Sequence, residues 1–146
     1  MSAGDRAAQR RRAAERLRAD LDEQRAALGE RVWTGPDGPE ALGRASALAV
    51  IQALGAGLPP RPGALRAAAR YLVGLLAAQA PGHAVEVRVP PNVVETDPVT
   101  WVRLAAGLTS WADALAAGAV RASGVRADLS PYLPVLEMPG AVGSEH

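Results

Sequence analysis

Few side chains in this sequence have the chemistry that catalysis or metal binding requires. Among 146 residues there are two histidines, His83 and His146, and no cysteine. A metal site or an acid–base pair needs several such groups within reach of one another. No second histidine lies near His83, which follows Pro81-Gly82 and is predicted to be a turn residue. The sequence therefore predicts no enzyme activity, no metal ion and no cofactor.

The carboxylates and serines near apolar segments have a structural explanation. Asp97 stands just before Pro98, and Ser110 stands three residues before Asp113. Both arrangements are typical of helix N-termini, where a short polar side chain accepts a backbone hydrogen bond. No Gly-x-Ser-x-Gly elbow and no phosphate-binding glycine loop is present. These residues are predicted to cap helices and not to act on a substrate.

The large apolar side chains gather in the last third of the chain. The main ones are Trp101, Leu104, Trp111, Leu115, Tyr132, Leu133, Val135 and Leu136. Ligand pockets are mostly apolar with few polar groups, so this composition suits a cavity of lipid size. The same residues can instead simply fill a core, and composition taken alone favours that interpretation over a cavity.

Hydrophobic spacing, caps and breakers indicate short elements around these residues. The predicted helices cover about 5–30, 39–56, 63–79, 97–106 and 110–118, with a last helical turn at 130. The predicted strands cover 84–89, 93–94 and 119–123. Strand 84–89 alternates apolar and charged residues, which is typical of a strand with one buried face.

The first predicted helix has its charges segregated. Residues 1–18 carry a net charge of +4, and residues 19–40 carry −4. A thin apolar seam runs along the helix through Ala14, Leu17, Leu21, Gln24 and Leu28, with Gln24 as an interruption. The interpretations are a docking or dimerising helix, an arginine-rich arm for nucleic acid, or a solvated extension. The acids that follow the arginines so closely count against the arm.

Composition narrows the class of partner. The formal net charge is +1, which argues against nucleic acid and against capture by an anionic membrane surface. No run of residues approaches the roughly 20 apolar positions of a membrane span. The absence of cysteine suits a reducing compartment, and no signal-peptide pattern precedes the first helix. A cytoplasmic location is predicted.

Three stretches resemble one known family. Val85–Pro91, Asn92–Trp101 and Ala117–Ser130 are similar to the bacterial branch of the sterol carrier protein family, and the resemblance covers about residues 46–136. It implies an α+β fold with a small, mainly antiparallel sheet packed with several helices around an apolar tunnel. It places six residues near that tunnel: Trp101, Leu104, Trp111, Leu115, Leu133 and Leu136. A strand-turn-strand segment that the family carries between Pro91 and Asn92 is missing here, which leaves two or three short strands.

The sequence thus predicts an N-terminal helical extension (1–33), a linker with a helix start (34–45), a reduced sterol-carrier-like domain (46–137) and a tail (138–146). The predicted function is non-catalytic binding of a lipid-like or sterol-like molecule in a hydrophobic cavity. The alternative is an interaction or scaffold module that forms a homodimer through Leu17, Leu21 and Leu28. The N-terminal helix is expected to pack against the sheet or to drive self-association.

Overall fold

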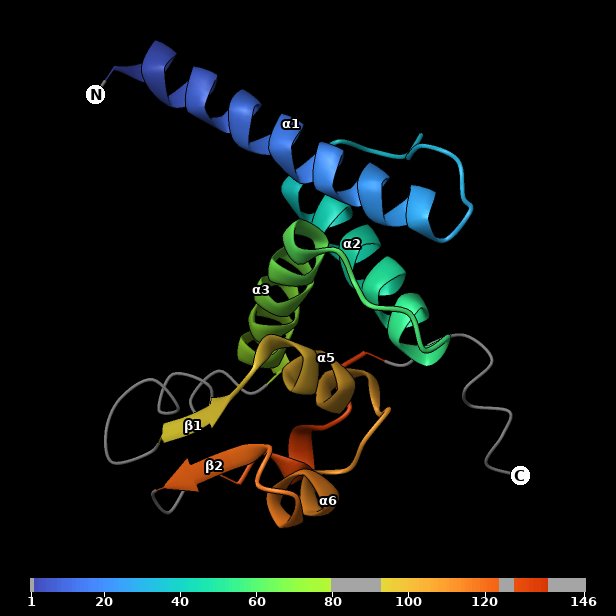
Figure 1. Cartoon of the computed structure of the whole chain (residues 1–146). Coiled ribbons are helices and arrows are strands. Elements are labelled where there is room, and N and C mark those ends of the chain that lie inside the picture. Colours follow the sequence, from blue (N-terminus) through green and yellow to red (C-terminus); the bar gives the residue numbers. More distant parts are fainter. Residues whose placement is uncertain (1, 80–92, 124–127, 137–146) are drawn as a thin grey trace. The chain divides into compact units, whose positions relative to one another are not determined.

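A computed structural model describes residues 2–79, 93–123 and 128–136 (Figure 1). Over these residues the chain is mostly helical, with five α-helices, two short strands and one 3₁₀ turn. In order they are α1 (Ala3–Ala27), α2 (Pro39–Gly55), α3 (Pro62–Gln79), β1 (Val93–Thr96), α5 (Pro98–Ala106), α6 (Trp111–Ala116), β2 (Val120–Ser123) and η1 (Ser130–Tyr132).

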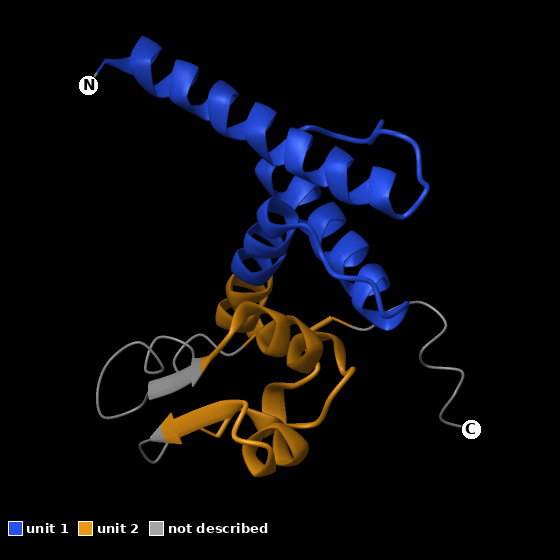
Figure 2. Ribbon diagram, viewed as in Figure 1, with its two compact units in different colours: residues 1–71 blue, residues 72–146 orange. Residues whose placement is uncertain are grey.

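The chain divides into two compact units (Figure 2). Unit 1 is Met1–Tyr71 and unit 2 is Leu72–His146, so the division falls within α3. These units are defined by contacts within the chain, not by resemblance to a family. The predicted bounds of the sterol-carrier-like domain, residues 46–137, therefore stay a prediction.

In unit 1, α1 is a polar helix that buries one narrow seam on α2. Ser2 caps its start by accepting a hydrogen bond from the Asp5 backbone N–H, and Gly29 follows its end with φ of 77°. Leu21 is completely buried in a cluster with Leu42 and Ala45 of α2. The partly buried residues packed against that cluster are Ala14, Leu17, Leu28 and Trp33. The seam predicted from the sequence is thus used within the chain, which argues against a dimer built on Leu21.

Gln24, predicted to interrupt the seam, is itself buried. Its side chain is 1% exposed, and its Oε1 accepts a hydrogen bond of 2.7 Å from the backbone N–H of Arg61. That bond ties α1 to the residue just before α3. Its Nε2 has no hydrogen-bond partner among the residues that the structure describes.

The segment after α1 folds back along that helix. The backbone N–H of Trp33 donates to Asp22 at 2.7 Å, and the Trp33 indole Nε1 donates to the carbonyl of Pro36 at 3.0 Å. The Arg25 guanidinium lies 5.7 Å from the centroid of the Trp33 ring, within the range of a cation–π contact. Arg18 forms an ion pair with Asp37. The segment predicted to be a linker is therefore held against α1 by hydrogen bonds and an ion pair.

In unit 2, two strands and two short helices follow one another closely. β1 and β2 pair antiparallel, with Val93 opposite Ser123 and Thr96 opposite Val120. The Thr96 hydroxyl donates to the carbonyl of Ala119 at 2.8 Å, which extends the pairing by one bond. One residue, Asp97, separates β1 from α5, and three residues separate α6 from β2.

The predicted fold class is confirmed in part. Helices dominate, and the sheet over the described residues has two strands, in line with the two or three expected after loss of a segment. The predicted strand 84–89 and the predicted tail lie outside the described residues. Within them, no helix combines the length and the apolar character needed to cross a membrane.

Candidate functional site

An apolar groove lies in unit 2, where the α5–α6 turn meets the segment after η1. We call it the α5–α6 groove; its volume is about 590 Å³. The apolar lining residues are Leu104, Gly107, Leu108, Trp111, Ala112, Leu133 and Pro134, and the polar ones are Thr109, Ser110, Asp113 and Ser130. Leu104 is 1% exposed and Trp111 is 9% exposed, so both are fixed in the core. Leu108 is 45% exposed.

The end of α5 creates one side of this groove. Gly107 ends the helix in the left-handed conformation, with φ of 78°, which a glycine adopts without steric cost. The chain then turns away and exposes Leu108. A Cβ added at Gly107 would lie 3.5 Å from Pro134 carbons, so the helix end and the later segment lie close together.

The opposite side is held by backbone hydrogen bonds. The N–H groups of Val135 and Leu136 both donate to the carbonyl of Ala105, at 2.8 and 3.1 Å. That carbonyl lies in the last turn of α5, where carbonyls lack helical partners. The Gln79 side chain donates to the Val135 carbonyl at 3.1 Å. These bonds place Leu133 and Pro134 beside the α5–α6 turn.

The polar groups nearby act as caps. Ser110 accepts a hydrogen bond of 3.0 Å from the Asp113 backbone N–H at the start of α6. Asp97 accepts bonds of 2.9 and 2.8 Å from the Thr100 N–H and hydroxyl at the start of α5. The Thr100 backbone N–H lowers the pKa of Asp97 below its ordinary value of 3.8, and the hydroxyl adds to this. Both caps were predicted from the sequence, and both are confirmed.

The six residues predicted to bind ligand have different positions. Leu104, Trp111 and Leu133 line the groove together. Trp101 and Leu136 are each 8% exposed and belong to the core, outside the lining. Leu115 is 42% exposed and is not part of the lining. Their role in binding stays a prediction.

Sequence reasoning missed Leu108 and Pro134. Leu108 follows a glycine that ends a helix, and a large apolar residue at such an exposed turn was a usable signal. No local signal points to Pro134, because its contact with Gly107 joins residues 27 positions apart. Among the described residues, no group of three or more His, Asp or Glu side chains is arranged to hold a metal ion.

Comparison with known proteins bears on this same segment. Residues 89–135 match the family model of the bacterial SCP ortholog, where SCP denotes sterol carrier protein. The resemblance to that family is confirmed over this segment. It is about a third of the chain, and it contains every residue that lines the α5–α6 groove. Unit 1 lies outside the match to the sterol carrier family. A search of curated proteins finds no significant match.

Proposed function

We propose that the chain is a non-catalytic binder of an apolar, lipid-like molecule, with the α5–α6 groove as the binding site. One observation carries the proposal: Leu104, Trp111 and Leu133, predicted from the sequence as ligand contacts, line one groove within the segment matched by the sterol carrier family. A volume of about 590 Å³ is in the range of small-molecule sites. An exposed Leu108 at the edge offers further apolar surface to a ligand.

The energetics favour weak and unselective binding. Burial of apolar surface contributes about 25 cal/mol per Å², so a ligand that buries roughly 300 Å² gains about 7 kcal/mol before the costs of association. The polar groups beside the groove include Ser110, whose hydroxyl already accepts a capping bond. Selectivity then comes from the shape of the groove, and because association itself costs about 4 kcal/mol or more, affinities weaker than micromolar are expected.

A brominated fatty acid tests the proposal, because bromine quenches a nearby indole. Dibromostearate is titrated into the full chain while tryptophan fluorescence is recorded, and saturable quenching is expected from binding beside Trp111. Two substitutions then locate the site. Leu108→Glu introduces a charge into the lining, whereas Leu58→Glu introduces the same charge at a leucine of similar exposure in unit 1, outside the lining.

We expect Leu108→Glu to weaken binding by about tenfold or more, since a carboxylate opposes burial of an acyl chain. Leu58→Glu is expected to change it by less than about twofold. Circular dichroism of both variants checks that the fold is kept. Non-saturable quenching, or equal loss in both variants, contradicts the proposal.

The alternative function, a scaffold that dimerises through Leu17, Leu21 and Leu28, has less support. Leu21 is completely buried on α2 within one chain, so it has no surface left for a second copy. Leu17 and Leu28 pack against the same cluster.

A further inference from the structure

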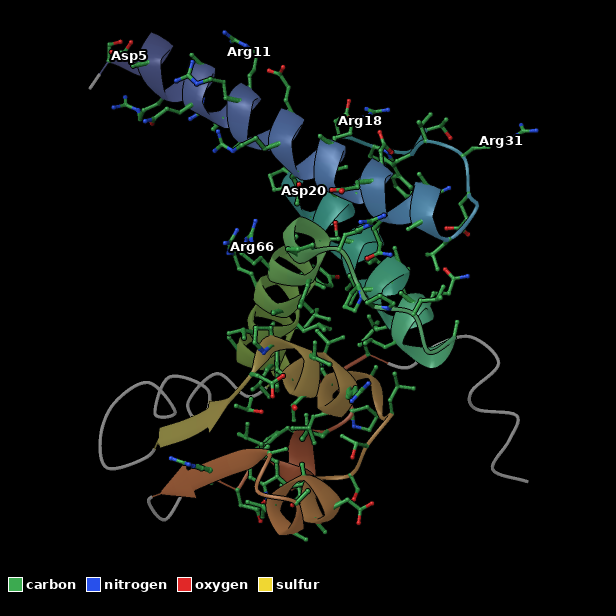
Figure 3. All side chains as sticks on the ribbon, in the orientation of Figure 1. Asp5, Arg11, Arg18, Asp20, Arg31 and Arg66 are labelled. Atoms are coloured by element: carbon green, nitrogen blue, oxygen red, sulfur yellow. The ribbon has the colours of Figure 1, made fainter. Side chains whose placement is uncertain are left out.

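A second hollow lies within unit 1, between the N-terminal half of α1 and the first turns of α3. We call it the arginine groove; its volume is about 790 Å³. Its apolar floor is built from small residues and one leucine: Ala7, Ala13, Ala14, Leu17, Gly63 and Ala67. Figure 3 shows Asp20 on the α3 side of α1 and Arg66 near the beginning of α3.

The lining of this groove is strongly basic. Arg10, Arg11 and Arg16 contribute from α1, and Arg66 and Arg70 contribute from α3. All five are exposed, and none has an ion-pair or hydrogen-bond partner among the residues that the structure describes. Since Arg66 and Arg70 are spaced by four residues, they lie on one face of α3.

The one acid in the lining does not neutralise these charges. Asp20 packs directly against Gly63, where its carboxylate leaves no room for a side chain. Gly63 is in the first turn of α3, where a negative charge is favoured by the helix dipole. Asp20 is thus placed to stabilise the junction of α1 and α3.

Three of the five acids that follow Asp20 in unit 1 are committed as well. Asp22 accepts from the Trp33 N–H, Glu30 pairs with Arg25, and Asp37 pairs with Arg18. Glu15, Glu23 and Glu40 remain, and they stand in helices that also carry arginines, so α1 and α2 of a second copy do not offer an acidic face free of positive charge. An acidic helix of a different protein complements the five arginines better.

We propose that the arginine groove docks an acidic amphipathic helix of a partner protein. The apolar side of that helix packs on Ala14, Leu17 and Ala67, and the small size of the two alanines permits close approach. Carboxylates on its flanks pair with the arginines of α1 and α3, a geometry that guanidinium groups favour. The docked helix of the partner then lies in the groove between α1 and α3, in contact with both helices. The proposal concerns unit 1 and does not depend on the function proposed for unit 2.

The lining favours a peptide over two other anionic partners. Single-stranded nucleic acid is bound by stacking on aromatic rings, and no aromatic residue lines this groove. A helix that lies on a membrane needs several large apolar side chains, whereas Leu17 is the one large apolar residue in the lining. The alanines of the groove suit the apolar stripe of an amphipathic helix, and the arginines around them suit its acidic flanks.

A designed peptide tests the proposal with the full chain. The probe is a fluorescein-labelled helix of about five turns, with leucine and alanine on one face and glutamate on both flanks. Binding is followed by fluorescence anisotropy at low salt. The matched variants are Arg66→Glu/Arg70→Glu in the groove and Arg44→Glu/Arg121→Glu, which changes the net charge equally at exposed positions outside it.

We expect the groove variant to bind the probe on the order of 30-fold more weakly and the control variant to change binding by less than about twofold. Amide hydrogen exchange in α1 is expected to slow on binding, and to slow less in the groove variant. A peptide with glutamine in place of glutamate is expected to bind on the order of 30-fold more weakly than the acidic probe.

Three results overturn the proposal. The first is that the glutamine peptide binds as tightly as the acidic one. The second is that the control variant loses as much affinity as the groove variant. The third is that a thymidine oligonucleotide, or phosphatidylglycerol vesicles, bind more tightly than the peptide and that this binding depends on Arg66 and Arg70. The last result reassigns the groove to nucleic acid or to lipid headgroups.

Discussion

Gly43 and Gly74 show how the absence of a side chain affects helix packing at one position and not at another. Both are helical glycines, Gly43 in α2 and Gly74 in α3. An added Cβ at Gly43 comes within 2.9 Å of Cδ1 of Tyr71, whereas nothing lies within 4 Å of one at Gly74. The absence of a side chain at Gly43 thus lets α2 approach Tyr71 closely.

Alanine substitutions at these two glycines are predicted to have opposite effects. Gly74→Ala is expected to raise the free energy of unfolding by about 0.5–1 kcal/mol, because alanine is the better helix former. Gly43→Ala gains the same propensity but overpacks the Tyr71 ring, at a cost of about 1–3 kcal/mol, and is expected to lower stability by about 1 kcal/mol. Urea denaturation of both variants measures the difference. A stabilised Gly43→Ala variant contradicts the close contact.

Gln24 gives a second prediction at the same scale. Gln24→Met loses the acceptor for the Arg61 N–H, worth about 1 kcal/mol, but also removes the unpartnered Nε2 from the interior. The two effects offset each other, and stability is expected to change by less than about 1 kcal/mol. Gln24→Ala leaves a void as well and is expected to cost about 2 kcal/mol or more. If both variants were equally unstable, the hydrogen bond would be the dominant contribution.

At the scale of elements, much of this fold follows from local chemistry. Asp97 with Pro98, Ser110 with Asp113, and Gly107 each mark a helix end in the sequence and in the structure. Caps and glycine stops act over a few residues, so a sequence reveals them. The walls of both grooves join residues far apart along the chain, such as Gly107 with Pro134 or Asp20 with Gly63. Such pairings depend on packing between elements, which local patterns do not specify.

The N-cap of α5 makes a prediction about pH. The lowered pKa of Asp97 means that its carboxylate stabilises the fold at pH above 3.8, and that this contribution is lost as the pH falls through the lowered value. Asp97→Asn keeps a capping acceptor that does not titrate. Its free energy of unfolding is expected to fall less than that of the original protein between roughly pH 6 and pH 3.

Two further variants separate the cap from its charge. Asp97→Ala removes the cap and is expected to cost about 1 kcal/mol near neutral pH. Thr100→Val removes the hydroxyl bond but keeps the backbone bond, which is the largest cause of the lowered pKa, so most of the pH dependence is expected to remain. Urea midpoints measured across the pH range decide both points. An unchanged pH profile in Asp97→Asn assigns the acid sensitivity to other groups.

For the molecule as a whole, each unit carries a groove of its own. The α5–α6 groove lies in the segment that matches bacterial sterol carrier proteins, and the arginine groove lies in residues outside that match. The sequence predicted an apolar site from the large residues near the C-terminus. It also showed the excess of arginine in the first helix, but not that Arg66 and Arg70 of α3 stand beside it. The two sites are therefore separable by mutation.

Leu21→Ala tests whether α1 is part of unit 1 or a means of self-association. Leu21 is completely buried on α2, so the substitution is expected to lower the free energy of unfolding by about 2–5 kcal/mol and to speed amide exchange in α2. The mass of the folded protein in sedimentation equilibrium is expected to stay that of the unmutated chain. Val32→Ala, at a residue that is 62% exposed, is the control and is expected to change stability by less than about 0.5 kcal/mol. A Leu21→Ala variant that keeps its stability but changes from dimer to monomer would instead establish α1 as a dimerisation helix.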